Sequence, residues 1–345
     1  MKRIASLFLA LVLAFSLCAC TVPVEKADDG KIQIVATLFP YYDFARAIVG
    51  ERADVTLLLS PGREAHSFEP TPLDAVTISE ADVFLYNGGE GEYWVDSMLD
   101  AAGEHITVVA RMMDYVDALG EEFSEGMQGA DEHEHEHDHD HDHDDHDDHD
   151  DHDHDDHDHD EEAHDSDAVE YDEHIWTSPK NAVLLCRAVC DAICQADPEN
   201  ADFYRANCDD YCAQLEALDA RFADLCENAP RKLLVFADRF PMLYFCREFG
   251  LNYRAAFHGC SGDTEPSLAT IKFLIDKVEE ESIPVVYTID FGTKKVAAVV
   301  SECSGAAVGT LYSMQTVSRA DFDAGETYLT LMERNYEALR KGLSE

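Results

Sequence analysis

Residues 199–228 read ENADFYRANCDDYCAQLEALDARFADLCEN, and their apolar side chains recur every three or four positions. This spacing places the apolar side chains on one face of an α-helix. Pro198 stands at the start of the pattern and Pro230 follows its end, as is typical of helix boundaries. A helix of about 30 residues would extend for about 45 Å. We therefore assign 197–229 to one linking helix, which would permit only limited rocking of the segments that it joins.

The segments on both sides of this helix share one pattern, in which short apolar runs alternate with helical stretches. The runs are 32–39, 54–59, 82–88 and 105–110 before the helix, and 232–237, 251–257, 284–290 and 306–312 after it. Such alternation at short intervals favours parallel strands covered by helices. The sequence thus predicts the α/β class, with two four-stranded parallel-sheet lobes, 31–196 and 230–345, bridged by one long α-helix.

The N-terminus has the features of an export signal. Two basic residues precede an apolar run that is too short to span a bilayer, and small residues follow. The tetrapeptide LCAC that ends at Cys20 resembles a bacterial lipobox, which implies cleavage before Cys20 and lipidation of its thiol, with Cys18 as the alternative acceptor. We expect a signal peptide at 1–20, a tether at 21–30, and a location in the cell envelope. The protein would be lipid-anchored to the outer face of the cytoplasmic membrane or periplasmic.

Residues 131–165 contain thirteen of the seventeen histidines and twenty-one carboxylates, but no Lys or Arg. Such a segment cannot bury enough apolar surface to become ordered, so we expect a disordered loop over 117–170. Imidazole favours zinc, copper or nickel over calcium or magnesium, and the tract would concentrate such metals locally. A solvated acidic spacer is the alternative. The net charge of −47 argues against nucleic acid as a partner, because phosphate binding needs clustered Lys and Arg.

Two rows of cysteines have the four-residue spacing of one helix face, namely Cys186, Cys190 and Cys194, and then Cys208 and Cys212. This spacing indicates buried small side chains more than a zinc site, because the chain has no CxxC motif. A disulfide between Cys260 and Cys303 is left open by the sequence.

Ligands bind beyond the carboxyl ends of the strands in open parallel sheets. The residues with metal-ligating side chains that follow the predicted strands are His66, His174, Asp238, His258 and Asp290. Two facing lobes would bring these nitrogen and oxygen ligands into one cleft. The sequence therefore predicts a metal site with contributions from both lobes.

Each candidate ligand has a plain structural alternative. His66 could be a turn residue, whereas His174 precedes a helix predicted over 179–196, capped by Ser178, that would hold its imidazole rigidly. Asp290 could instead cap the next helix, and Asp238 could pair with the arginine beside it or cap a helix. The loop that follows His258 leaves the direction of that ring open.

Three motifs and the histidine-rich loop carry a family resemblance. The motifs are PGREAHSFEPTPLD (61–74), DEHIWTSP (172–179) and AGETYLTLMERNYEALRKGL (324–343). Together they resemble the zinc and manganese solute-binding lipoproteins of ABC importers, the ZnuA-like or TroA-like family. The resemblance covers essentially the whole mature chain, and it implies two α/β lobes joined by a rigid helix.

The resemblance also implies a ligand set, with His66 and His174 as the two histidine ligands and Asp290 as the carboxylate ligand. The third histidine of the family normally follows the first strand of the second lobe, where this chain has Asp238 instead. His258, Asp238, a water molecule or a histidine of the tract would then complete a set of four ligands.

We therefore expect a monomeric binding protein, and not an enzyme, that captures zinc(II) and delivers it to an ABC permease and its ATPase. Manganese or nickel is the alternative cargo, and the histidine tract favours zinc because manganese prefers oxygen-rich sites. A zinc metallohydrolase would need a placed general base, and the sequence has no HExxH motif. A metal buffer or an adhesin that works without a transporter is a further alternative. Because the ligands must be deprotonated, metal affinity should fall at low pH.

Overall fold

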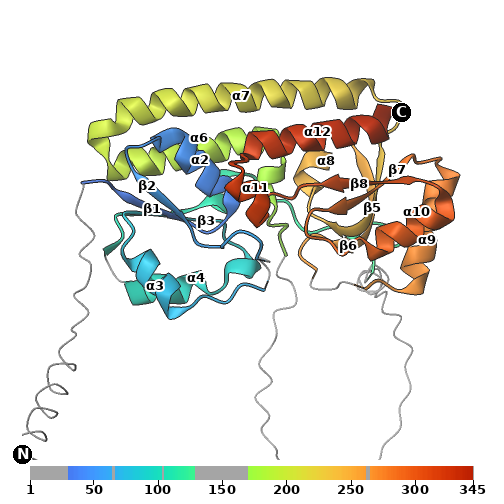
Figure 1. Ribbon diagram of the computed structural model, residues 1–345, viewed down its shortest axis with the longest axis horizontal. Coiled ribbons are helices and arrows are strands. Elements are labelled where there is room, and N and C mark those ends of the chain that lie inside the picture. Colours follow the sequence, from blue (N-terminus) through green and yellow to red (C-terminus); the bar gives the residue numbers. More distant parts are fainter. Residues whose placement is uncertain (1–29, 64–66, 103–104, 129–169, 262–264, 345) are drawn as a thin grey trace, which may run out of the picture. The chain divides into compact units, whose positions relative to one another are not determined.

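A computed structural model describes residues 30–63, 67–102, 105–128, 170–261 and 265–344 (Figure 1). Within it, Ile32–Glu345 form one compact unit. Cys20 with the rest of the predicted signal peptide, most of the predicted tether, His66 and the tract at 131–165 lie outside the described residues. Every helix in the described ranges is too short or too polar to serve as a membrane span.

The first sheet has four parallel strands in the order β2-β1-β3-β4. Its two central strands carry almost entirely apolar side chains, which are buried because helices cover the sheet. The strands are β1 (Gln33–Ala36), β2 (Asp54–Leu57), β3 (Val83–Tyr86) and β4 (Val108–Arg111), and the helices are α2 (Phe39–Val49), α3 (Pro72–Ser79), α4 (Val95–Ala102) and α6 (Pro179–Ala196). Helix α6 begins where the sequence predicts, because the Ser178 hydroxyl accepts a hydrogen bond from the Asn181 backbone at the helix N-terminus.

The second sheet repeats this plan, with four parallel strands in the order β6-β5-β7-β8. Its strands are β5 (Leu233–Phe240), β6 (Asn252–His258), β7 (Val285–Ile289) and β8 (Ala307–Leu311), and its helices are α8 (Leu243–Phe249), α9 (Leu268–Glu280), α10 (Lys295–Ser304), α11 (Arg319–Asp323) and α12 (Tyr328–Ser344). The predicted α/β class with two four-stranded parallel sheets is therefore confirmed.

Helix α7 (Ala201–Asn228) is the long helix that joins the two sheets, and Figure 1 shows it running past both of them. Its first half packs on α2 and α6, and its second half packs on α8 and α12. Tyr211 contacts Phe44 of the first lobe, with ring centroids 5.9 Å apart. Phe222 contacts Phe245 of the second lobe at 5.0 Å. The apolar face read from the sequence is thus a strip of core shared by both lobes.

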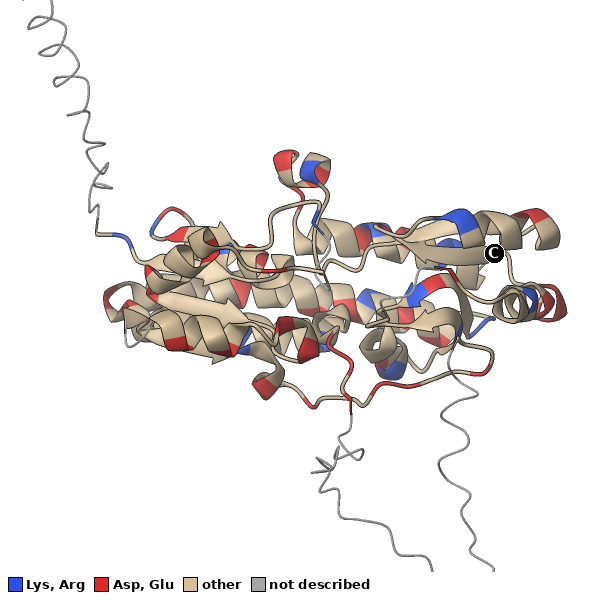
Figure 2. Cartoon of the chain, turned by 90° about the horizontal axis from the view of Figure 1, so that it is seen from below, with Lys and Arg blue, Asp and Glu red and all other residues tan. Residues whose placement is uncertain are grey.

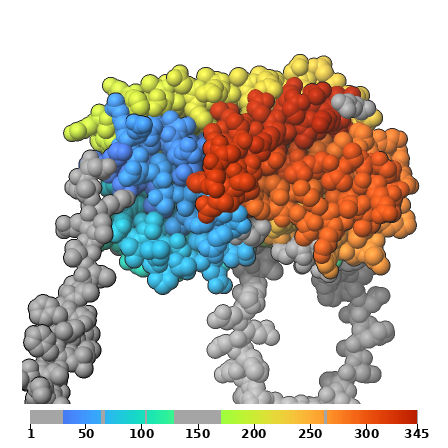
Figure 3. All heavy atoms as spheres, viewed as in Figure 1, coloured from blue at the N-terminus to red at the C-terminus, as the bar shows by residue number. Residues whose placement is uncertain are grey.

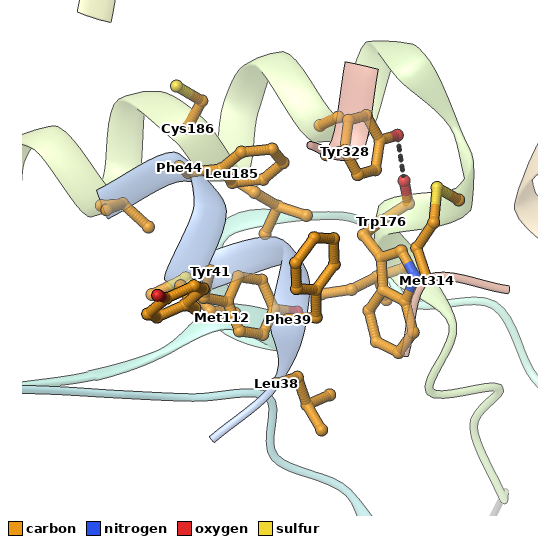
Figure 4. Close-up of a cluster of buried hydrophobic side chains, with 14 of the residues drawn as sticks. Leu38, Phe39, Tyr41, Phe44, Met112, Trp176, Leu185, Cys186, Met314 and Tyr328 are labelled. Atoms are coloured by element: carbon orange, nitrogen blue, oxygen red, sulfur yellow. Dashed lines mark hydrogen bonds between the residues drawn. The ribbon is translucent and has the colours of Figure 1, made fainter. Parts of the chain in front are cut away.

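The C-terminal helix α12 also crosses from the second lobe to the first, as Figure 3 shows where its red atoms lie against blue atoms. The Tyr328 hydroxyl donates a 2.7 Å hydrogen bond to the Trp176 carbonyl (Figure 4). The Tyr328 backbone N–H donates to the Asp43 carboxylate at 2.9 Å. The Tyr211 hydroxyl donates to the same Asp43 oxygen at 2.8 Å. One buried carboxylate therefore joins α2, α7 and α12.

Residues 117–128 correct the prediction of a disordered loop that begins at 117. This segment, which we call the strap, lies along the second lobe. The Leu119 backbone N–H donates to the Tyr244 hydroxyl at 3.0 Å, and the Gln128 backbone N–H donates to the Ala256 carbonyl at 3.0 Å. Backbone hydrogen bonds to an ordered partner override the polar composition that suggested disorder.

The nine cysteines among the described residues are all free, so Cys260 and Cys303 are not paired. The five cysteines of the two rows on α6 and α7 are buried, in agreement with the helical spacing. Their sulfur atoms gather at the contact between the two helices.

The shared core on α7 leads to a stability prediction. Phe222→Ala should lower the free energy of unfolding by about 3–5 kcal/mol, because the ring is fully buried against three aromatic neighbours. The control Leu184→Ala removes a side chain that is 45% exposed on α6 and should change it by no more than about 0.5 kcal/mol. Urea unfolding of the metal-free protein measures both values. Equal losses would contradict a core that runs through α7.

Candidate metal-binding site

Two adjoining pockets lie at the carboxyl ends of the two sheets. The first is lined mainly by residues that follow strands of the first lobe, including Asn87 and Glu92. The second is lined mainly by residues at or just after the ends of strands of the second lobe, including Gly259 and Ser313. Gln315 lines both pockets, so they meet between the lobes, where parallel sheets place their ligands.

His174 lines the second pocket and is only 1% exposed. It stands just before the short 3₁₀ helix Ile175–Thr177, which leads into α6. Its Nδ1 atom lies 3.2 Å from an oxygen of the Asp172 carboxylate, and its backbone N–H donates to the same oxygen at 2.8 Å. A proton on Nδ1, shared with Asp172, assigns the lone pair of the ring to Nε2. This is the arrangement by which carboxylates orient histidine ligands of metals.

The end of β6 approaches His174 closely, and Gly259 makes this possible. A Cβ atom at Gly259 would lie 3.0 Å from His174 Nδ1 and 3.1 Å from a carboxylate oxygen of Asp172. Any larger residue would therefore push the second lobe away from the imidazole. Gly259 therefore lets the end of β6, in the second lobe, lie next to the His174 ring.

Asp290 follows β7, and the residues on either side of it, Ile289 and Phe291, line the same pocket as His174. Its carboxylate accepts a 3.2 Å hydrogen bond from the Ser313 backbone N–H. Burial raises its pKa to about 6, so a cation nearby would favour its charged form. Helix α10 begins after Lys294 and has no side-chain cap, so the alternative role of Asp290 as a helix cap does not apply.

Asp238 lies within β5, and its carboxylate accepts hydrogen bonds from the neighbouring strand β7. It accepts hydrogen bonds from the Thr288 hydroxyl and, at 3.3 Å, from the Ile289 backbone N–H. A Cβ atom at Gly292 would lie only 1.7 Å from the same carboxylate oxygen, so the loop after β7 is folded tightly over it. These contacts give Asp238 a structural role, in holding that loop.

His258 ends β6, and its ring turns toward the strap. Its Nδ1 atom lies 2.5 Å from a carboxylate oxygen of Glu121, and the Phe123 ring packs on it with centroids 5.0 Å apart. The hydrogen bond with Glu121 raises the pKa of His258. Although burial opposes it, hydrogen bonds from His258 and Cys260 lower the pKa of Glu121. His258 would have to leave this ion pair before it could bind a metal.

His66 lies outside the described residues, but the chain on both sides of the gap is placed. The Gly62 backbone N–H donates to the Val317 carbonyl at 2.7 Å. Phe68 lines the first pocket and packs on Trp94, with ring centroids 5.3 Å apart.

Two buried carboxylates that the sequence analysis did not single out line the first pocket, Glu92 and Glu173. Glu173 accepts a 2.7 Å hydrogen bond from the Gly91 backbone, and burial raises its pKa. Glu92 accepts a 2.8 Å hydrogen bond from the Gly88 backbone, and burial raises its pKa to about 7. Glu173 stands directly beside His174 in the DEHIWTSP motif, which is the signal that could have found it. Figure 2 shows further acidic residues on both lobes, with basic residues between them.

Comparison with known proteins places the chain among zinc-uptake proteins. The family model described as zinc-uptake complex component A, periplasmic (ZnuA), matches residues 34–342. The zinc-binding lipoprotein AdcA of Streptococcus pneumoniae is 30% identical over 342 residues, which are 99% of this chain and 61% of that protein. The high-affinity zinc uptake system protein ZnuA of Bacillus subtilis is 29% identical, with 99% of this chain and 98% of that protein covered.

Solved structures agree with this likeness. The Zn(II)-bound ZnuA-like domain of S. pneumoniae AdcA superimposes with a TM-score of 0.69 at 25% identity, over 92% of this chain and 100% of that domain. The chain spans about 61% of the length of the AdcA proteins that it matches.

The buried Glu92 leads to a prediction about pH. Its folded pKa is about 7 and its unfolded pKa about 4.5, so folding becomes less favourable as the pH rises between these values. Glu92→Gln removes this penalty and keeps an oxygen that can accept the Gly88 hydrogen bond. The variant should gain up to about 2–3 kcal/mol over the wild type at about pH 8, and nothing at about pH 4.5.

Urea unfolding of the metal-free protein across this pH range measures the effect. The control Glu90→Gln changes an exposed residue of the same short helix and should show no such trend. A gain that does not depend on pH would contradict the assignment to a buried, titrating carboxylate.

Proposed function

This chain belongs to the family of periplasmic zinc-uptake components, and from that premise we propose that it captures zinc(II) between its two lobes for delivery to an ABC permease and its ATPase. His174 carries the proposal. It is a fully buried imidazole, oriented by a carboxylate, in the pocket of the second sheet, and Gln315 of this pocket also lines the pocket of the first sheet. A buried imidazole with this partner suits a metal ligand, because the Asp172 contact fixes its tautomer and holds the ring in place.

We assign the ligands as His66, His174 and Asp290, with the metal as cargo and not as a catalyst. Zinc accepts tetrahedral nitrogen and oxygen ligation, which two imidazoles and one carboxylate begin to fill. Asp238 is the weakest candidate for the remaining position, because its carboxylate already holds the loop after β7. Water, a histidine of the tract or His258, after release from Glu121, would complete the set.

Zinc is favoured over manganese by the two histidines and by the names of the relatives, which are zinc-binding and zinc-uptake proteins. Capture is favoured over catalysis because the described carboxylates Glu173 and Asp290 accept hydrogen bonds from backbone groups, which hold them in place. The lipid anchor at Cys20 and a monomeric state complete the proposal.

Substitution of the two histidines tests the ligand assignment. His66→Ala and His174→Ala should each weaken zinc binding by at least about 100-fold, because each removes a ligand from a site of three or four. The control His105→Ala changes an exposed histidine that precedes β4 and should leave the affinity unchanged. Titration against a zinc chelator, repeated in competition with manganese and nickel, measures the affinities and the cargo. Wild-type affinity in His174→Ala would contradict the proposal.

Deletion of 131–165 separates the tract from the cleft. The shortened protein should keep the tight zinc site and lose weaker binding, so the number of zinc ions bound per chain should fall while the highest affinity stays. Equilibrium dialysis with chelator competition measures both quantities. Loss of the tight site in this variant would show instead that the tract supplies a primary ligand.

A further inference from the structure

The contact between α6 and α7 holds a group of thiols that zinc capture in the cleft does not use. The sulfur atoms of Cys186, Cys208 and Cys212 all lie within 4.8 Å of one another. Cys186 comes from α6, and the other two come from one face of α7. All three side chains are buried, with exposures of 0%, 3% and 0%. We call these three residues the thiol triad.

The spacing of the triad suits a shared metal ion. Metal–sulfur bonds of about 2.3 Å place two sulfur ligands about 3.8 Å apart in tetrahedral geometry and about 4.0 Å apart in trigonal geometry. The Cys208 and Cys212 sulfur atoms are 3.9 Å apart. Both of these cysteines stand on α7, and the Cys186 sulfur of α6 lies within 4.8 Å of each of them, so thiols from two helices meet at one point.

The chemistry of the triad selects the class of ion. The group consists of thiols alone, without an imidazole or a carboxylate. Soft thiolate ligands favour soft cations such as monovalent copper, whereas manganese and magnesium prefer oxygen. Three ligands with little room for water fit an ion that accepts three-coordination. Cadmium(II) belongs to the same soft class and serves as a spectroscopic probe.

The neighbouring thiols are directed toward the Cys208 sulfur, and the Cys208 thiol lies 3.8 Å from the Cys186 carbonyl. Hydrogen bonds from the Cys186, Cys190 and Cys212 thiols lower the pKa of Cys208, whereas the same contacts raise the pKa of Cys186. The thiols that surround Cys208 otherwise find only weak partners, such as the Val183 carbonyl, 3.9 Å from the Cys212 sulfur. Coulombic interaction with Cys212 raises the pKa of Arg187, whose guanidinium pairs with Asp209 at 3.3 Å.

We propose that Cys186, Cys208 and Cys212 form a second metal site, separate from the interlobe cleft, that binds one soft thiophilic cation. Each thiol that binds gives its proton to water, and a sulfur–metal bond replaces the S–H bond. No electron is transferred when the ion is supplied as copper(I) or cadmium(II). The site lies at the contact between α6 and the first half of α7, on the side of the first sheet.

The test titrates the full mature chain, reduced and saturated with zinc at the cleft, with cadmium(II). The ultraviolet thiolate-to-cadmium charge-transfer band reports sulfur ligands only, so binding by the histidine tract does not contribute. The wild type should develop the band to one equivalent per chain. Cys208→Ala should weaken this binding at least tenfold, and Cys226→Ala, which changes another buried cysteine of α7, should leave it unchanged.

The outcomes are decisive in both directions. Absence of the band in the reduced wild type, or equal bands in Cys208→Ala and Cys226→Ala, would overturn the proposal. Circular dichroism and zinc affinity at the cleft confirm that each variant is folded. If Cys208→Ala does not fold, Cys212→Ala replaces it with the same expected loss. Competition between copper(I) and cadmium(II) for the band then shows whether both ions use the triad.

Discussion

The buried carboxylate of Asp43 is the contact on which the arrangement of the two lobes depends. It lies on α2 of the first lobe and accepts hydrogen bonds from Tyr211 of α7 and from the backbone of Tyr328, where α12 begins. Burial raises its pKa, so its charge is tolerated only because these donors surround it. A carboxylate without them would cost several kcal/mol, so the three helices keep their positions together. The aromatic rings of Phe44, Tyr211 and Tyr328 pack around the same point.

The contacts of Asp43 with α7 and α12 explain why residues that are distant in sequence can lie together in the cleft. Buried side chains of α7 and α12 belong to a core that both lobes share. The carboxyl ends of the two sheets therefore keep fixed positions relative to each other. Gly259 can then lie close to His174, and no other part of the protein has to move. The same rigidity lets buried carboxylates remain beside the imidazole, where a cation would relieve the cost of their desolvation. Preorganised ligands lose little entropy on binding, which favours high affinity.

Much of the fold could be predicted from the sequence, because it depends on local periodicity. The α7 pattern, the eight apolar runs and the Ser178 cap each require only neighbouring residues to be read. The pairing of His258 with Glu121 could not be predicted, because it joins residues 137 positions apart through the strap. The hydrogen bond from the Thr288 hydroxyl to Asp238 could not be predicted for the same reason. Polar composition suggested disorder for 117–128, yet backbone hydrogen bonds to the second lobe decide its structure.

The strap and the segment that precedes His174 also pair with each other through their backbones. The Glu121 backbone donates to the Glu170 carbonyl at 2.8 Å, and Gly120 and Tyr171 form an antiparallel bridge. The two ends of the intervening segment are therefore held side by side, and its first residues, 122–128, lie along the second lobe. Loop-closure entropy grows only with the logarithm of length, by about 0.6 kcal/mol for each doubling. A change in the length of the chain between Gln128 and Glu170 would therefore alter the cost of closing this loop only slightly.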